Sequence, residues 1–520
     1  MRQKIFFQIK KYGPIATITF LGLFLRLYKL EIIPPSIFID EYNLALDALR
    51  IINKTKHLPW YGIGWYGTPA LFIHYLAFIF KILKPSFWTI KIAWVLPATL
   101  VIPSSYFLAK NIFNKQVATI STLFLTLSPI HIHLSRWAHG AIIVPTIFVF
   151  SVLALFLFHK KNKKTILILS AFILAISIYT YVGARVYLMF FTIMTLWYLF
   201  IYHKEKTLRK ILNCFLFWLV FFACLFPFLR YGVNHPIEFT GRTKEVMILN
   251  LNAGLKGNIN LITENILKYL GMFINLQDPN IRHNPLKTAP FTKTTSFMFG
   301  VSFLILFLKK KYKKLLFFTI LLITGLAGGI LSKEAPSTFR TATIIPFVYM
   351  LSGYTLYQIL DFLNRKLLNQ KTRTQYLALV TILMLTFIPI MDRLIQFYNY
   401  QNWQRPDIKI AFTNHALTVA KLAKEYFQRG YIIYLSHDYY WYSSTQFEIE
   451  STEKNNPYQI HNPNSLPQYQ KGNQYFLILD PADEALLSYY EKNLTSFNLH
   501  FEKKSDAKPF FTIELKPKLP

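Results

Sequence analysis

Residues 211–230 read ILNCFLFWLVFFACLFPFLR, a run of twenty residues whose one charge stands at its end. A helix of that length rises about 30 Å, which is the thickness of the hydrocarbon core of a bilayer. Similar runs recur along the 520-residue chain, which is 53% hydrophobic and 17% aromatic. The sequence therefore predicts a polytopic, all-α membrane protein.

The number of membrane crossings follows from where the basic residues fall. Apolar runs lie near residues 14–30, 67–83, 88–109, 116–134, 141–158, 165–182, 184–201, 211–230, 293–308, 315–331, 341–361 and 376–393. If all but 67–83 cross and the N-terminus is inside, the inner segments 1–13, 110–115, 159–164, 202–210, 309–314 and 364–374 carry 23 Lys and Arg. The short outer turns 135–141, 180–185 and 332–340 then carry only 4. Because cytoplasmic loops are the basic ones, we predict about eleven spans, with the N-terminus inside and the C-terminus outside.

The excluded run, residues 67–83, contains Pro69 and His74 and is rich in aromatic residues. This composition favours a helix that lies at the outer interface. The topology then places the outer loops 31–87 and 231–292 on the same face as the tail after Arg393. We predict two domains, which are a transmembrane bundle over residues 1–393 and a small soluble, extracytoplasmic α/β domain over residues 394–520.

The tail has the pattern of a small α/β unit. Residues 411–429 predict an amphipathic helix closed by Gly430, and residues 431–435 predict a strand. Further strands are predicted over 474–479 and 511–516, with a helix over 483–494 between them. No glycine-rich phosphate loop opens either helix, so we predict no nucleotide site.

Charge and cysteine content exclude several other classes. The formal net charge is +32, but Lys and Arg form short clusters between apolar runs, which is typical of membrane orientation and not of nucleic-acid binding. The only two cysteines, Cys214 and Cys224, share one apolar run, so neither a zinc site nor a disulfide framework is predicted. The basic N-terminus is followed by apolar residues to Leu30 without a small-residue cleavage site, and we expect it to be the first span.

Two carboxylates, Asp40 and Glu41, follow the first predicted span within the sequence IFIDEY at residues 37–42. Ionisable groups beside apolar spans are costly to place and are often functional. Asp40 would equally suit the N-cap of an amphipathic helix from about Glu41 to Asn53. Asp47, two helical turns further on, would then lie near the same face as Asp40.

Arginines and aromatic residues gather at the same predicted face. The segments are SRWAH at 135–139, YTYVGAR at 179–185, the loop with His235, Arg242, Asp278 and RHNP at 282–285, and Arg340 at the start of the tenth span. One carboxylate among several arginines suits a reaction in which a base deprotonates an acceptor hydroxyl while cations stabilise a departing phosphate. A guanidinium group can bind two phosphate oxygens at once. Taken singly, Arg136 and Arg185 could instead anchor span ends by reaching to lipid headgroups.

The histidines raise a metal site as a competing interpretation. His131 and His133 are two residues apart, which directs them to different sides of a helix. We therefore predict no metal ligands and no firm cofactor, with a divalent metal left as an alternative. His139 is expected to cap or to pack. The aromatic residues Trp60, Tyr61, Trp65 and Tyr66 fit an interfacial belt better than sugar stacking.

With these features in place, the chain resembles the C-type (GT-C) membrane glycosyltransferases. It is most similar to bacterial relatives of the dolichyl-phosphate-mannose protein O-mannosyltransferases (family 39-like) and of the lipid A aminoarabinose transferase. The resemblance covers about residues 10–395 and rests on short motifs that occur in a shared order. The motifs are FIDE at 38–41, GTPAL at 67–71, Ser128-Pro129 leading to Ser135-Arg136, Tyr179-Thr180-Tyr181 with Arg185, Arg282-His283-Asn284, and Arg340 with Pro346.

The resemblance implies a bundle of eleven to thirteen spans with interfacial helices in the first outer loop. It implies that Asp40 is the catalytic base, which takes the acceptor's proton as the acceptor attacks a sugar carried on a polyprenyl phosphate, with inversion. The residues predicted to contact substrate are Glu41, Arg136, Arg185, Arg282, His283 and Arg340. Many relatives carry an Asp or Glu shortly after the Ser-Arg pair of the third span, where this chain has His139, so a second acidic role or a metal at that position is in doubt.

We therefore predict a hexosyl- or pentosyltransferase of the cytoplasmic membrane with its active site on the outer side. Its expected partners are a polyprenyl-phosphate sugar donor, membrane lipids and a protein, lipid or glycan acceptor, and not nucleic acid. A transporter or flippase of lipid-linked sugars is the main alternative, but it would distribute polar residues along the spans near the midplane. A noncatalytic scaffold with a receptor-like outer domain is a third possibility, which only the large tail supports.

Overall fold

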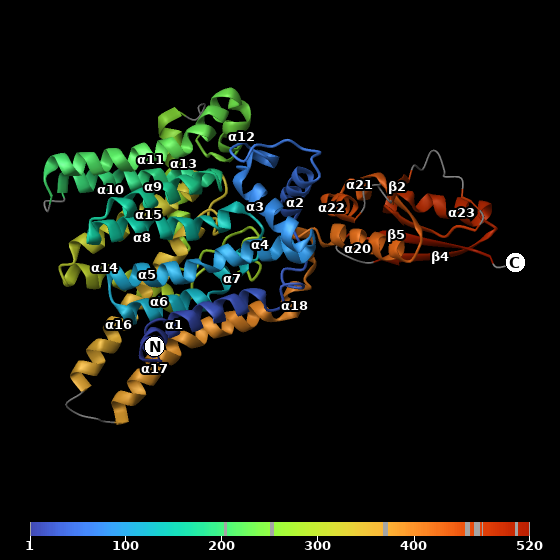
Figure 1. Cartoon of the computed structure of the whole chain (residues 1–520). Helices are drawn as coiled ribbons and strands as arrows, with labels where there is room; N and C mark the ends of the chain where they lie inside the picture. The colour runs from blue at the N-terminus through green and yellow to red at the C-terminus, as the bar shows by residue number, and fades with distance from the viewer. Residues whose placement is uncertain are drawn as a thin grey trace. The chain divides into compact units, whose positions relative to one another are not determined.

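The computed structural model describes residues 2–201, 205–249, 254–367, 373–452, 458–461, 469–470, 472–504 and 508–518. The described residues are mostly helical. It divides into two compact units, of which the first comprises residues 1–30, 58–72 and 91–399 and the second residues 31–57, 73–90 and 400–520 (Figure 1). Parts of the predicted inner segments 202–210 and 364–374 lie outside the described residues.

The first unit is a bundle of helices. Its long helices are α1 (Arg2–Leu27), α5 (Val101–Ile112), α6 (Lys115–Leu127), α8 (Val144–Lys161), α9 (Lys164–Ile178), α10 (Tyr187–Ile201), α11 (Thr207–Asn234), α12 (Pro236–Val246), α13 (Gly254–Gly271), α14 (Lys293–Leu308), α15 (Tyr312–Ile330), α16 (Ile345–Leu367) and α17 (Arg373–Tyr398). Shorter pieces are η1 (Trp65–Gly67), α7 (Pro129–Ser135), η2 (Gly140–Ile142), η3 (Val182–Val186) and η5 (Ala342–Ile344). Helix α4 (Phe87–Thr99) passes from the second unit into the first.

Within the described residues, seven helices are long and apolar enough to cross a membrane. An eighth candidate is the bent pair α6 and α7, which meet at 63°. Four shorter apolar helices cover Tyr12–Leu27, Leu71–Leu83, Lys164–Ile178 and Lys293–Leu308. The eleven-span topology stays a prediction, and it requires three of these four shorter helices to cross in addition to the eight.

The bend between α6 and α7 has a local cause in Ser128 and Pro129. Pro129 has no backbone N–H to continue α6, and it disfavours helical dihedrals at the residue before it. Ser128 is extended, with ψ 111°, and its hydroxyl accepts a hydrogen bond from the His131 backbone N–H, so that a new helix begins there. The bend delivers Arg136 and His139 to the turn that follows α7.

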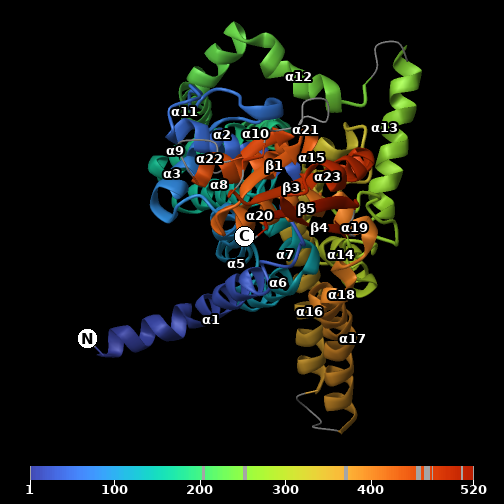
Figure 2. The same cartoon turned by 90° about the vertical axis from the view of Figure 1, so that its right-hand side faces the viewer.

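The second unit contains a five-stranded mixed sheet in the order β2-β1-β3-β5-β4. The strands are β1 (Ile432–Ser436), β2 (Tyr458–His461), β3 (Tyr475–Leu479), β4 (Phe497–Lys504) and β5 (Phe510–Pro517). The pairs β1–β2 and β1–β3 are parallel, whereas β3–β5 and β4–β5 are antiparallel. Figure 2 shows β1, β3 and β5 side by side.

Helices cover both faces of this sheet, so its central strands are buried on both sides. The helices of the unit are α2 (Ile39–Ile52), α3 (Leu71–Leu83), α18 (Tyr400–Trp403), α19 (Pro406–Ala411), α20 (Asn414–Gln428), α21 (His437–Tyr440), α22 (Ser443–Thr452), η6 (Pro481–Leu486) and α23 (Leu487–Asn493). Along β3, Phe476 and Ile478 pack with residues of α20 and α22, while Leu477 packs with Tyr490 of α23. This alternation explains the continuous apolar sequence YFLIL of β3.

The small C-terminal sheet confirms the α/β character predicted for the tail, and the structure corrects several details. The predicted helix over 411–429 is α20, which begins at Asn414 after the separate helix α19, and the helix predicted over 483–494 is split into η6 and α23. Strands β2 and β4 and helix α22 were not predicted. The two-domain division at residue 393 and the outer location of the tail stay predictions.

The topology can be tested by labelling single cysteines in a variant with Cys214 and Cys224 replaced by serine. Asn162 ends α8, and Lys492 lies on α23 of the sheet domain; both are exposed. Because the topology places residue 162 inside and the tail outside, we expect an impermeant maleimide to label Lys492→Cys in intact cells and Asn162→Cys only after permeabilisation. Labelling of Asn162→Cys in intact cells would contradict the topology.

Candidate active site

His139 lies at the centre of the polar turns of the first unit. Its Nδ1 atom accepts a hydrogen bond from the Ala141 backbone N–H at 3.2 Å, which caps η2 and confirms the expected capping role. The imidazole contacts the rings of Tyr181 and Phe339, with centroids 5.5 and 4.9 Å away. Because Nδ1 is the acceptor, the neutral ring carries its proton on Nε2 and can donate from there.

Three arginines act electrostatically on His139. Burial, together with the positive charges of Arg242, Arg340 and Arg282 and the neighbouring His283, lowers the pKa of His139 to about 3. These side chains come from α12, from the turn before η5 and from the loop before α14, which are far apart in sequence. The fold thus brings together Arg282, His283 and Arg340 of the predicted set, and adds Arg242. We call Arg242, Arg282 and Arg340 the arginine cluster.

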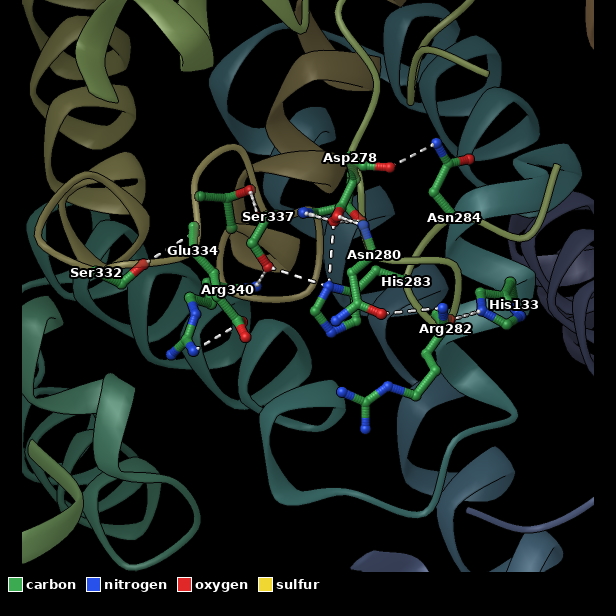
Figure 3. A network of polar contacts seen from close by, with 12 residues as sticks. His133, Asp278, Asn280, Arg282, His283, Asn284, Ser332, Glu334, Ser337 and Arg340 are labelled. Atoms are coloured by element: carbon green, nitrogen blue, oxygen red, sulfur yellow. Dashed lines mark hydrogen bonds and ion pairs between the residues drawn. The ribbon is translucent and has the colours of Figure 1, made fainter. Parts of the chain in front are cut away.

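Asp278 joins two of the contributing segments. Its Oδ2 atom accepts hydrogen bonds from the backbone N–H and the hydroxyl of Thr338 at 2.7 and 2.9 Å, and its Oδ1 atom accepts from the Asn280 N–H at 2.9 Å. The same Oδ2 lies 3.2 Å from Nδ1 of His283. Only 1% of the Asp278 side chain is exposed. One buried carboxylate therefore fixes the loop that carries Arg282 against the turn that carries Arg340 (Figure 3).

The ring of His283 is held in one orientation. Ser337 Oγ lies 3.3 Å from the same Nδ1 atom that faces Asp278, and Phe339 stacks on the ring at 5.1 Å with an interplanar angle of 7°. Since both polar contacts are made by Nδ1, the Ser, His and Asp side chains do not form a nucleophilic relay, which would need one partner on each ring nitrogen. Nε2 lies on the other side of the ring, away from Asp278, and in the neutral ring with its proton on Nδ1 it is an acceptor.

Arg340 has a neutralising partner on one side only. Its Nη2 atom donates to Glu334 Oε2 at 3.0 Å, and 57% of the Glu334 side chain is exposed to solvent. The Nε atom of Arg340 is buried and has no hydrogen-bond partner among the described residues. Buried donors are usually hydrogen-bonded, so an open one of this kind marks a place where a ligand or water completes the contact. In the view of Figure 3, the guanidinium groups of Arg282 and Arg340 both extend below the network.

Arg242 is positioned by contacts with Tyr66 and Gly67. Its guanidinium group lies 4.2 Å from the ring centroid of Tyr66 and donates to Glu245 at 2.9 Å. Tyr66 also donates to Glu245, and these two hydrogen bonds lower the pKa of that exposed carboxyl. A Cβ atom on Gly67, which has φ +75°, would lie 2.6 Å from Cβ of Arg242. Glycine is therefore required there both by its dihedral angle and by the close approach of α12.

Arg185 and Arg136 both donate hydrogen bonds to other groups of the protein. Arg185 donates to the Thr243 hydroxyl at 3.2 Å and to the Phe239 carbonyl at 3.3 Å, so it braces α12, the helix that carries Arg242. Arg136 is fully buried and donates to carbonyl oxygens at the end of α1, those of Leu25 at 2.7 Å and Tyr28 at 2.5 Å. These contacts give both arginines a structural role, and we assign Arg136 no part in the proposal below. Substrate contact by either one stays a prediction.

Asp40 lies in the second unit, in the first turn of α2. The helix spans Ile39–Ile52 with Phe38 as its N-cap, so the interpretation of Asp40 as an N-cap is wrong. The Glu41 side chain reaches back and accepts from the Phe38 N–H at 2.8 Å, which makes Glu41 the capping carboxylate. Asp47 is also committed, because its carboxylate pairs with Lys56 at 2.5 Å. Asp40 is half-buried, near the positive end of the helix dipole, where an ionised carboxylate is stabilised.

Two other features bear on the site. A hollow of about 320 Å³, open to solvent, lies beside the first turn of α2 and is lined by Ile37, Ile39 and Tyr42 together with Thr413, His415, Ala416 and Tyr442–Ser444.

Across the described residues, no three His, Cys, Asp or Glu side chains are grouped as a metal site would need. His131 and His133 have different partners, since His131 Nδ1 contacts Arg26 and His133 Nε2 contacts the Arg282 carbonyl.

Comparison with solved structures identifies the class of fold. The crystal structure of ArnT from Cupriavidus metallidurans bound to undecaprenyl phosphate is similar over 96% of this chain and 98% of its own, with a TM-score of 0.53 and 11% identity. The archaeal oligosaccharyltransferase AglB from Archaeoglobus fulgidus, in complex with an inhibitory peptide and a dolichol-phosphate, is similar over 84% of this chain, with a TM-score of 0.54 and 10% identity. This chain covers 64% of the AglB chain. The fold is that of the GT-C membrane glycosyltransferases.

The sequence also matches one family model over part of its length. Residues 68–231, less than half of the chain, match the family model of dolichyl-phosphate-mannose-protein mannosyltransferase. No curated protein matches the chain in sequence. The predicted resemblance to the mannosyltransferase-like GT-C proteins is thereby confirmed. The residues of the site are not tested by this match, and their roles are proposals.

Removing the charge of Asp278 should destabilise the turns that carry Arg282 and Arg340. An Asp278→Asn variant places an amide NH₂ group opposite one set of donors, so we expect a loss of about 3 kcal/mol of stability, typical of breaking a buried charged network. The check is the apparent melting temperature in detergent. Asp438→Asn, which changes an exposed carboxylate, is the matched control and should melt like the wild type. Equal melting of both variants would contradict the role given to Asp278.

His139 should contribute to acid sensitivity. Its folded pKa of about 3 is below the ordinary value of 6.5, so between these values the unfolded chain binds more protons and stability falls as the pH falls. Between pH 7.5 and pH 5 the wild type should therefore lose more stability than His139→Gln, by a difference on the order of 2 kcal/mol. Thermal unfolding at the two pH values measures this difference. Parallel losses in the two proteins would show that the His139 pKa is not depressed.

Proposed function

We propose that the protein is an inverting glycosyltransferase that moves a sugar from a polyprenyl-phosphate carrier to an acceptor hydroxyl at the outer face of the cytoplasmic membrane. The observation that carries the proposal is the convergence of Arg242, Arg282 and Arg340 on the neutral His139. The fold supports the same class, because similar structures hold undecaprenyl phosphate or dolichol-phosphate. The acceptor is a protein, a lipid or a glycan.

The arginine cluster has the donors that a lipid-phosphate leaving group requires. Asp278 is held by Thr338 and Asn280, while Glu245 pairs with Arg242 and Glu334 pairs with Arg340. The buried Nε donor of Arg340 has no partner among the described residues. A phosphate there would receive charge-assisted hydrogen bonds from planar guanidinium groups, which suit its geometry. His139 supplies a further donor from Nε2.

In the proposed reaction, the Asp40 carboxylate takes the proton of the acceptor hydroxyl. The hydroxyl oxygen forms a bond to the anomeric carbon, and the bond from that carbon to the phosphate oxygen breaks. The electron pair leaves with the polyprenyl phosphate, whose added negative charge the arginine cluster stabilises. Attack opposite to the leaving group inverts the anomeric configuration. Since the carrier is a lipid phosphate, this reaction needs no nucleotide site.

Translocation of lipid-linked sugars is the second candidate. A translocator would bind its polar headgroup near the membrane midplane, on discontinuous helices, whereas the polar network of the first unit is built from the turns that connect helices. A translocator also has no use for a general base. One assay distinguishes the two functions, because transfer breaks the bond between sugar and phosphate and translocation leaves it intact.

Replacing the proposed base should abolish transfer without abolishing donor binding. In Asp40→Asn we expect the rate of donor consumption by purified protein in nanodiscs to fall at least 100-fold, the usual contribution of a general base. The dissociation constant of the donor should change by less than about threefold, because the amide has the same shape. Asp40→Glu keeps the base at a different distance and should retain part of the rate. Undiminished turnover in Asp40→Asn would rule out the base assignment.

Neutralising an arginine of the cluster should weaken donor binding, which Asp40→Asn should leave nearly unchanged. We expect Arg282→Gln and Arg340→Gln each to weaken binding of the polyprenyl-phosphate donor about 10- to 100-fold, because each removes a charged hydrogen bond worth about 1.5–3 kcal/mol. Arg365→Gln is the matched control, because this arginine is 77% exposed and pairs with Asp361. Binding titrations with and without a chelator measure the effect and any need for a divalent ion. Unchanged affinity in both cluster variants would remove the phosphate site.

A further inference from the structure

The helix that carries Asp40 is held by a helix of the sheet domain. Both α2 and α22 belong to the second unit, and they pack against each other along their length. The sequence SSTQFEIEST of α22 has no apolar stripe, so its place in the fold is not evident from the sequence. Its side chains nonetheless divide into three faces with different partners.

One face of α22 belongs to the core of the sheet domain. Ile449 is buried among residues of β1, β3 and α20, and Thr445, one turn earlier, is fully buried. A second face holds α20, because Glu448 pairs with Lys424 at 2.5 Å and Ser444 donates to the Ala416 carbonyl at 3.0 Å. These contacts attach α22 to α20 and to the core of the sheet domain.

The third face meets α2. Residues 443, 447 and 450 are spaced by four and three, so they lie on one side of a helix. Glu450 accepts a two-pronged set of hydrogen bonds from Arg50, with distances of 2.6, 2.9 and 3.1 Å. Ser443 donates to Asn43 Oδ1 at 2.9 Å. Between these two contacts, Phe447 is buried and packs on the ring of Tyr42 at 5.7 Å.

The two polar contacts fix the orientation of α2. Asn43 and Arg50 are seven residues apart, which is two helical turns along one side, so the pair of contacts sets both the tilt and the rotation of the helix. Asp40 lies one turn before Asn43. Any rotation of α2 that breaks the contact of Ser443 or Glu450 therefore displaces the Asp40 carboxylate. A displacement of about 1 Å at a catalytic group can cost about 100-fold in rate.

We propose that Ser443 and Glu450 of the C-terminal domain are positioning residues for the Asp40 base. The proposal rests on the proposed function, in which Asp40 takes the acceptor's proton. It assigns the C-terminal domain a part in the reaction, which is to hold α2 in its working orientation. Neither residue touches the reacting atoms; both act through the helix.

The expected effect is on rate and not on folding. The Arg50 and Glu450 side chains are 38% and 23% exposed, and partly exposed ion pairs contribute little to overall stability. The test variant is Ser443→Ala/Glu450→Gln in the full-length chain. We expect kcat for sugar transfer to fall about 10-fold, with the donor dissociation constant unchanged within threefold. The control is Glu491→Gln, which alters an exposed glutamate of α23 and should leave both constants unchanged.

A charge reversal tests the contact itself. In Arg50→Glu and in Glu450→Arg alone, like charges face each other, and kcat should fall at least as far as in the test variant. Combining Arg50→Glu with Glu450→Arg restores the ion pair and should recover at least half of the lost rate. Two positions that do not interact would give additive losses. Additive losses in the double reversal would overturn the proposal.

A second measurement does not depend on activity. We expect the amides of residues 39–52 to exchange faster with deuterium in Ser443→Ala/Glu450→Gln than in the wild type, while those of β1 and β3 keep their protection. Unchanged exchange in 39–52, or full kcat in this variant, would overturn the positioning role even if Asp40→Asn is inactive. Full transfer by Asp40→Asn would instead refute the proposed function, and the exchange data would still report whether α22 holds α2.

Discussion

The polar side of the first unit depends on one buried carboxylate. Asp278 satisfies donors from Thr338 and Asn280 and contacts His283, and so it joins two turns that are about sixty residues apart in sequence. An uncompensated carboxylate would be costly at such a buried position, so the network has to form completely to be stable. Once it has formed, the backbone segments that carry Arg282 and Arg340 are held in fixed positions. The arginine cluster is a consequence of that constraint.

The carboxylates around the arginine cluster each have partners inside the fold. Asp278 accepts from backbone and side-chain donors, Glu245 pairs with Tyr66 and Arg242, and Glu334 pairs with Arg340. Burial and the neighbouring cations keep His139 neutral, so it can donate without adding charge. A phosphate that enters such a region finds donors already oriented. This preorganisation is the main way in which a protein stabilises charge that develops on a leaving group.

The sequence predicts the apolar helices well, because a run such as 211–230 has only one stable arrangement in a bilayer. The strands β1, β3 and β5 were also predicted, since their apolar runs are buried on both faces. Strand β4 could have been found from the alternation of Phe497, Leu499 and Phe501. Helix α22 could not, because its own sequence shows no apolar stripe and its partner α2 lies about 400 residues away.

Site residues were harder to predict than elements. The sequence singled out Asp40, Arg282, His283 and Arg340, but the convergence of the cations is a long-range property that no local pattern contains. Arg242 was noticed and left out of the binding set, although Gly67 packs directly against it. Glu41 caps its own helix, a role that the spacing of Phe38 and Glu41 could have indicated, and its contact with substrate stays a prediction.

The central claim is that the bond between sugar and phosphate is broken. The most direct measurement is ³¹P NMR of nanodiscs that contain the protein, a polyprenyl-phosphate sugar and candidate acceptors. The account predicts that the phosphodiester signal of the donor is replaced by the phosphomonoester signal of free polyprenyl phosphate, and that this does not occur with Asp40→Asn. A donor that crosses the bilayer of a proteoliposome with its phosphodiester intact would contradict the account and would establish translocation instead.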